Sequence, residues 1–253
     1  MEVHAHTHSA RKKWTHYFWE FLMLFLAVFC GFLAEYQLEH KIEKDRIGKY
    51  MKDMIVDLLN DTAYINERFV YTGETIKVLD SFKHNLYSDS AFDNTPVLYI
   101  QYSNYSRLLT ANFNDQTITQ LRSAGNLRLI DNEEIVAKLS DYWVGINELK
   151  TIAERVEQRY DASQEMAYHI FNRRYFYTHG FLDSLQKDFR LFDSIKHLAP
   201  MLLMTKEKND LIAFANIIDR VKGSIVRFRQ RLLIQKRFAT SLITLIKKEY
   251  HLE

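Results

Sequence analysis

The chain has 253 residues, of which only 7 are Gly and 2 are Pro, and its formal net charge is +2. So few turn-forming residues favour long helices, and the near balance of charge excludes the strongly basic surface that is typical of nucleic-acid binding. The single cysteine, Cys30, excludes a disulfide within the chain.

Residues 1–16 form a polar N-terminal tail in which His4, His6 and His8 alternate with other residues. Alternating imidazoles can bind a transition metal. These histidines lie in a tail ahead of an apolar segment, so we interpret them as solvated; weak surface metal binding is the alternative. We assign no metal site to them.

Residues 17–36 read YFWEFLMLFLAVFCGFLAEY and predict a transmembrane helix. Fourteen residues between Glu20 and Glu35 carry no charge and no Pro. As a helix, the full segment would rise ~30 Å, the thickness of the hydrocarbon core of a bilayer. Aromatic residues lie at both ends, with Trp14, Tyr17 and Trp19 at one end and Tyr36 at the other, as is typical at membrane interfaces.

Two other kinds of segment share these features. The basic residues 11–13 ahead of the apolar run also suit a secretory signal, but no small-x-small cleavage site follows at Ala34. Phe29 before Cys30 argues against a lipoprotein cleavage site. A buried helix of a soluble protein would be striped, whereas this segment is apolar on every face. We therefore predict an uncleaved signal anchor.

The remaining chain divides into a charged helical neck, residues 37–46, and a helical-bundle domain, residues 47–253. In the neck, only Leu38 and Ile42 are apolar. The bundle then begins with a helix that ends near Leu86, before a polar loop. Apolar residues in this helix alternate steps of four and three, a heptad pattern that predicts packing against partner helices. Its members are Met51, Ile55, Leu58, Thr62, Ile65, Phe69, Thr72, Ile76 and Leu79.

Two short helices follow. The first has Thr95 as its cap and Pro96 in its first turn, and its apolar face comprises Leu98, Tyr102, Tyr105 and Leu109. The second follows residues 114–115 and ends at Gly125, a residue type suited to a left-handed helix terminus. Residues 126–130 form a connector.

The next helix is predicted to start with a capping-box pair, Asp131 and Glu134, and to run to about Tyr175, before a break at 179–180. Residues 181–204 predict a short helix and a turn around Pro200. The heptad positions of the helix that starts near Asp131 are Ile135, Leu139, Tyr142, Ile146, Leu149, Ala153, Val156 and Tyr160.

The last helix is predicted to begin near Thr205, and it carries two rows of apolar residues at seven-residue spacing. Gln235 is the one polar member of the second row. The rows are Ile218, Ile225, Leu232, Ala239 and Ile246, and Phe214, Val221, Phe228 and Leu242. The fold class is therefore all-α, with one N-terminal transmembrane helix followed by an antiparallel bundle of long heptad-patterned helices.

No residue pattern defines a catalytic constellation. Glu165 and His169 are four apart and could form half of a metal site, but no Glu-x-x-His motif accompanies them. Residues 173–174 and the basic residues of 227–237 form basic faces. We interpret Arg227 and Arg231 as solvated ion-pair partners of neighbouring acids rather than as a phosphate site, and we place Arg229 on the water-facing side. We assign no catalytic residue, cofactor or metal, and predict a non-enzymatic interaction, scaffold or sensory module. The alternative is a membrane-bound hydrolase or metal enzyme with a site inside the bundle.

Two stretches resemble an uncharacterised family of single-pass membrane proteins of Bacteroidota, a domain of unknown function. One is HYFWEFL at residues 16–22 with EYQLEH at 35–40, and the other is TITQLRSAGNLRLI at residues 117–130. The resemblance implies the same architecture of one span and a helical domain, and it implies no site residue.

The segment around the span also predicts location and partners. We expect a bacterial inner-membrane protein that crosses the lipid bilayer once. Basic residues flank the span on both sides, but a tight cluster precedes it and long domains translocate regardless of charge, so we place the C-terminal domain in the periplasm. Ala27 and Gly31 are spaced to let two helices approach. Expected partners are the bilayer and a protein partner or a second copy, with no nucleic acid.

Overall fold

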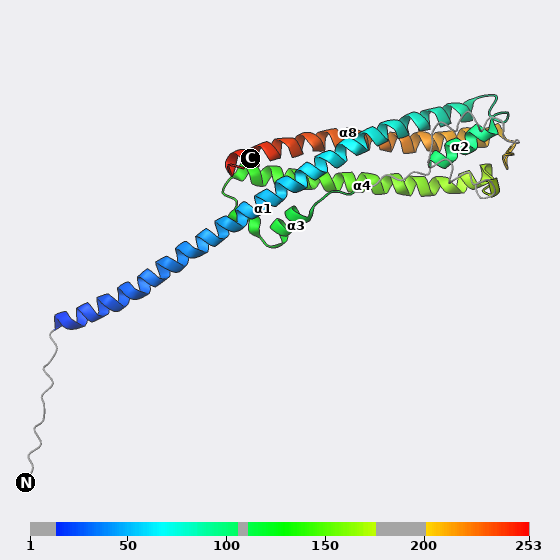
Figure 1. The fold of residues 1–253 in the computed structure, drawn as a ribbon. Coiled ribbons are helices and arrows are strands. Elements are labelled where there is room, and N and C mark those ends of the chain that lie inside the picture. Colours follow the sequence, from blue (N-terminus) through cyan, green and yellow to red (C-terminus); the bar gives the residue numbers. More distant parts are fainter. Residues whose placement is uncertain (1–13, 106–110, 176–200, 253) are drawn as a thin grey trace, which may run out of the picture. The chain divides into compact units, whose positions relative to one another are not determined.

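The computed structural model describes residues 14–105, 111–175 and 201–252. Within these ranges the protein is helical and has no strand. Its elements are α1 (Trp14–Tyr87), α2 (Thr95–Tyr105), α3 (Gln116–Ser123), the 3-10 helix η1 (Asn126–Leu129), α4 (Glu133–Ile170) and α8 (Lys208–Glu249) (Figure 1). The chain divides into two compact units, Met1–Tyr50 and Met51–Glu253.

The first unit contains the N-terminal half of α1. Among the described residues, α1 is the one helix that is long and apolar enough to cross a membrane, and its apolar stretch has no buried residue. Phe21, Leu24 and Val28 are all more than half exposed. By length and composition this stretch is a candidate membrane span.

In the second unit, the C-terminal half of α1 buries one face. Met51, Leu58 and Ile65 are fully buried, as the spacing of these residues predicts. Three predicted positions are corrections, because Thr62, Phe69 and Ile76 are only half-buried, and Thr62 donates to the carbonyl of Leu59 (2.8 Å). The neighbouring Asp61 is buried instead, because it has hydrogen-bond partners on other segments.

The two short helices follow the sequence with one correction: α2 already includes Thr95, so Asn94 and not Thr95 is the residue that precedes the helix. After α1 ends at Tyr87, a turn leads to α2, in which Pro96 occupies the first turn. Leu98, Tyr102 and Tyr105 are buried as expected, and Leu109 lies outside the described residues. After α3, Gly125 has φ = +67°, the left-handed conformation that glycine adopts without strain.

Both ends of α4 differ from the sequence prediction. The N-cap is Asn132, whose Oδ1 accepts hydrogen bonds from the amides of Glu134 (3.0 Å) and Ile135 (3.2 Å), so Asp131 is not the cap. The helix ends at Ile170 rather than near Tyr175. Phe171 has an extended backbone and a buried ring that stacks on Tyr102, 4.5 Å between centroids, and this packing takes the chain out of the helix.

The last helix, α8, begins at Lys208, three residues later than predicted. Thr205 accepts a hydrogen bond from the Glu207 amide (3.0 Å) and donates to the Asp210 carboxylate (2.5 Å), so it organises the turn before the helix. The expected helix over 181–204 lies outside the described residues up to 200, and residues 201–204 are not helical. All members of the two seven-residue rows are buried, and so is Gln235.

The core of the second unit lies between the C-terminal half of α1, α4 and α8. Helices α4 and α8 run side by side (Figure 1), and α1 contacts both of them. Ion pairs join α1 to α8: Lys83 to Asp219 (2.6 Å) and Lys222 to Asp80 (2.7 Å). Arg231 of α8 pairs with Glu148 of α4. These contacts are exposed at the rim of the core, so they add little stability individually.

Candidate functional site

A buried carboxylate cluster lies among the described residues of the second unit. Asp57 and Asp61 of α1 are 8% and 2% exposed. They meet Asn114 and Thr117, at the start of α3, and Tyr142 of α4. The two aspartates are four residues apart and therefore share one face of α1, the face that packs into the bundle.

Every carboxylate oxygen of the cluster accepts a hydrogen bond. Asp61 accepts from the Asn114 amide (2.8 Å) and from the Tyr142 hydroxyl (2.5 Å). Asp57 accepts from the Asn114 side chain (2.5 Å) and from the Thr117 amide (3.3 Å). Buried carboxylates need such donors, because an unpaired one would be strongly destabilising.

The environment shifts the proton affinities in the cluster. Burial raises the pKa of Asp61 above its usual value, and the hydrogen bonds from Asn114 and Tyr142 lower it in part. Burial raises the pKa of Tyr142 well above the usual range of a phenol, and the Asp61 charge adds to this effect. Tyr142 therefore stays neutral and acts as a hydrogen-bond donor to Asp61.

The cluster also caps a helix. Asp115 is the N-cap residue of α3 but makes no side-chain cap bond. Its carboxylate pairs instead with Lys150 of α4 (2.5 Å). Asp57 of α1 caps α3 instead, because its carboxylate accepts a hydrogen bond from the Thr117 amide in the first turn. A carboxylate is favoured at the N-terminus of a helix. The cluster therefore joins α1, α3 and α4.

A second polar contact lies next to the cluster. Gln235 of α8 is 2% exposed and donates from Nε2 to the backbone carbonyl of Tyr142 (2.8 Å). Its side chain lies against Gly145, where a Cβ would overlap Oε1 of Gln235. The sequence predicts that Gln235 marks either the loosest point of the apolar row or the place where the last helix meets a polar partner. The structure shows a polar partner, the backbone of α4. The sequence indicates the role of Gly145 only in that a glycine lies inside a long helix.

An aromatic cluster fills the core around α2. Its rings come from α1, α2, α8 and the residue after α4: Phe82, Tyr99, Tyr102, Tyr105, Phe171 and Phe214. The tyrosine hydroxyls find partners within the protein. Tyr102 donates to Gln164 (2.7 Å) and Tyr105 to Ser163 (2.9 Å). These aromatics therefore act as core residues rather than as an open binding surface.

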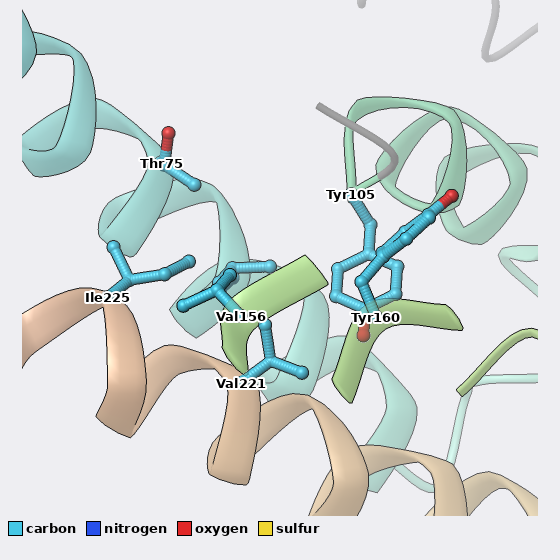
Figure 2. A pocket seen from close by; sticks show the side chains of 7 residues that line it. Thr75, Tyr105, Val156, Tyr160, Val221 and Ile225 are labelled. Atoms are coloured by element: carbon cyan, nitrogen blue, oxygen red, sulfur yellow. The ribbon is translucent and has the colours of Figure 1, made fainter. Parts of the chain in front are cut away.

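A small cavity is lined by Tyr105, one residue of the aromatic cluster, and by side chains of α1, α4 and α8 (Figure 2). It holds about 10 Å³, room for a single water. Small-molecule sites are far larger, roughly 300–1,000 Å³, so this cavity has no room for a substrate. Its lining is mostly apolar: Thr75, Leu79, Tyr105, Val156, Tyr160, Val221 and Ile225.

The candidate metal ligands from the sequence do not come together with others. Glu165 and His169 are exposed on α4. Among residues 14–105, 111–175 and 201–252, no group of three or more His, Cys, Asp or Glu side chains could hold a metal ion. His4, His6 and His8 lie outside the described residues.

The basic residues of α8 are only partly solvated. Arg227 is exposed, and Arg231 pairs with Glu148 as an ion pair of the kind expected. Arg229 is a correction to the expected water-facing side. Its guanidinium lies 3.6 Å from the centroid of the Phe69 ring, and its Nε donates to the Phe69 carbonyl (3.3 Å). Arg229 therefore packs against α1 through a cation–π contact with Phe69.

Comparison with protein-family models, with curated proteins and with solved structures gives no match for this chain. The resemblance of residues 16–40 and 117–130 to a family from Bacteroidota stays a prediction.

Proposed function

We propose that the protein is a non-enzymatic helical interaction, scaffold or sensory module that a single N-terminal helix anchors in the bacterial inner membrane. The observation that carries this proposal is the division of α1. Its N-terminal part is apolar and outward-facing, whereas Met51, Leu58 and Ile65 farther along are buried in the helical unit. One helix thus supplies both a membrane-length segment and a core element of the domain.

We further propose that the domain is an antiparallel bundle of α1, α4 and α8. The contacts between helices support this arrangement. Along α1, Phe69 meets Arg229 while the later Asp80 meets the earlier Lys222, so the numbering of α8 falls as that of α1 rises. Between α4 and α8, Lys138 meets Ser241 and Arg159 meets Ser224. Both pairings are those of helices that run in opposite directions.

The interaction role is supported by what the buried polar groups do. Asp57, Asp61 and Gln235 all have partners that hold segments of the domain together. They therefore serve the packing of helices, and the domain presents its outer faces to other molecules. A pull-down of the tagged full chain from native membranes tests this role. A reproducible partner or a second copy is expected, and turnover of a substrate by the purified chain would contradict the proposal.

Membrane orientation has a direct test. Alkaline phosphatase fused to the C-terminus of the full chain is active only on the periplasmic side, so an active fusion is expected. A fusion to green fluorescent protein should be dark if the domain is exported unfolded through the general secretion route. The reverse pattern of the two reporters would place the domain in the cytoplasm.

A further inference from the structure

Within the second unit, α1 carries a second set of apolar residues that its own bundle does not cover. Val56, Leu59 and Val70 are 56%, 50% and 65% exposed, and Ala63 is exposed between them. They follow one another in steps of three, four and seven residues. We call them the outer stripe.

The outer stripe lies on the side of α1 that faces away from the bundle. At 3.6 residues per turn, its members are displaced by about half a turn from Met54, Leu58 and Ile65, which are buried. The buried face already explains how α1 packs within its own chain. The outer stripe therefore has no role in the intramolecular core.

The same heptad register continues in the sequence of the first unit. Counting back in steps of three and four from Val56 passes through Ile42 and Leu38, the only apolar residues of the neck, and then through the apolar segment. In this register the a positions include Val28, Ile42, Val56 and Val70, and the d positions include Leu24, Leu38 and Leu59. β-Branched residues at a with Leu at d favour parallel two-stranded coiled coils.

We propose that the outer stripe binds the outer stripe of a second copy of this chain, so that two α1 helices pair in parallel. This inference rests on the proposed anchor. Two copies inserted through the same span have the same direction, and parallel pairing is the arrangement that this a and d composition favours. Gly31 also supports pairing with a second copy. It falls on a d position, and Ala27 lies four residues before it. A Cβ at Gly31 would meet nothing within 4 Å in its own chain. A close approach of two spans uses this pair of small residues.

Charged residues interrupt the register between the two apolar parts. Glu35 occupies an a position near the end of the apolar segment, Asp45, Lys49 and Lys52 occupy consecutive core positions, and Asn66 occupies a later one. Each of these residues would face its own copy. Like charges at such positions are unfavourable. The pairing therefore depends on the membrane, which confines the two copies and raises their effective concentration.

Disulfide trapping in native membranes tests the pairing. Cys30 is first replaced by Ser, and Val56→Cys is then introduced into the full chain. The matched control is Val144→Cys on α4, because Val144 is also an exposed valine, at 57%. On mild oxidation, Val56→Cys is expected to yield a disulfide-linked dimer several-fold more abundant than Val144→Cys. Equal linking at the two positions, or no linked dimer with Val56→Cys, would overturn the proposal.

A second pair of variants separates specific pairing from collision. Leu59→Glu, added to Val56→Cys, puts a charge into the outer stripe and should lower the linked fraction several-fold. Val144→Glu, added to Val56→Cys, should leave it unchanged. Carbonate extraction of the same membranes reports on the anchor separately: release of the chain would refute the anchor, whereas a retained chain without linked dimers would refute only the pairing.

Discussion

Gly145 of α4 and Gln235 of α8 are in direct contact, and a Cβ on Gly145 would occupy the position of the Gln235 side-chain oxygen. The same Gln235 donates to the Tyr142 carbonyl at 2.8 Å. The absence of a side chain at Gly145 therefore allows a buried amide from α8 to reach the backbone of α4. A glycine in a helix interior destabilises the helix by roughly 0.5–1 kcal/mol relative to Ala, and this contact is the compensation.

The first prediction follows from this contact. Gly145→Ala should destabilise the full chain in detergent by about 1–3 kcal/mol, the range for overpacking a core, despite the better helix propensity of Ala. Thermal unfolding followed by circular dichroism measures the effect. Gly223→Ala is the control, because a Cβ there meets nothing within 4 Å, and it should be neutral or stabilising. A stabilising Gly145→Ala would show that Gln235 does not need this space.

The second prediction compares two neighbours on α8. Leu232 is fully buried, so Leu232→Ala should lower the free energy of unfolding by about 2–5 kcal/mol. Arg229→Ala removes a cation–π contact with Phe69 and should cost ~1 kcal/mol, the smaller effect of the two. Urea unfolding of both variants measures the difference. A larger loss of unfolding free energy for Arg229→Ala would mean that the guanidinium is the main contact between α8 and α1 at this point along the two helices.

The heptad spacing identified most of the buried faces, because the side chains that a long helix buries repeat with its turns. In α4, for example, Ile135, Leu139 and Tyr142 are buried at the predicted spacing. The same reasoning missed Tyr99, which is buried on the other side of α2. A short helix surrounded by other segments is buried on several faces, and a one-sided pattern cannot show this.

Sequence reasoning could have found part of the carboxylate cluster and not the rest. Asp57 and Asp61 lie among the buried residues of α1, so their position on the apolar face was a signal. Their partners were hidden, because Asn114 and Tyr142 lie 53 and 81 residues from Asp61 along the chain. Spacing within one helix carries no information about such distant pairs. For the same reason, Arg229 could not be paired with Phe69 in advance.

The third prediction concerns alkaline pH. Burial raises the pKa of both Tyr99 and Tyr105 to about 12, from 10.0 for a free phenol. Because the folded-state pKa is raised, the stabilising contribution is complete below pH 10 and is lost as pH rises towards 12. The full chain should therefore lose stability over this range. In Tyr105→Phe the loss should be shallower, after a cost of about 1 kcal/mol at neutral pH for the hydrogen bond to Ser163. An unchanged pH profile would assign the titration to other groups.

The fourth prediction compares two aspartates with opposite shifts. Burial raises the pKa of Asp61 above 3.8, whereas the hydrogen bond from Lys83 lowers the pKa of the exposed Asp219 below 3.8. The contribution of Asp61 is therefore complete below pH 3.8 and is lost as pH rises through its folded-state pKa. The contribution of Asp219 is present above pH 3.8 and is lost as pH falls.

Asparagine at either position removes the titration, so the stability difference between variant and wild type should change with pH in opposite directions. From pH 3 to pH 7, Asp61→Asn should gain stability relative to wild type, and Asp219→Asn should lose it. Urea unfolding of the full chain in detergent at each pH gives both slopes, and any constant cost of the substitution cancels. A negative slope for Asp61→Asn would mean that the hydrogen bonds from Asn114 and Tyr142 outweigh burial, and that the Asp61 carboxylate is held in its ionised form in the folded protein.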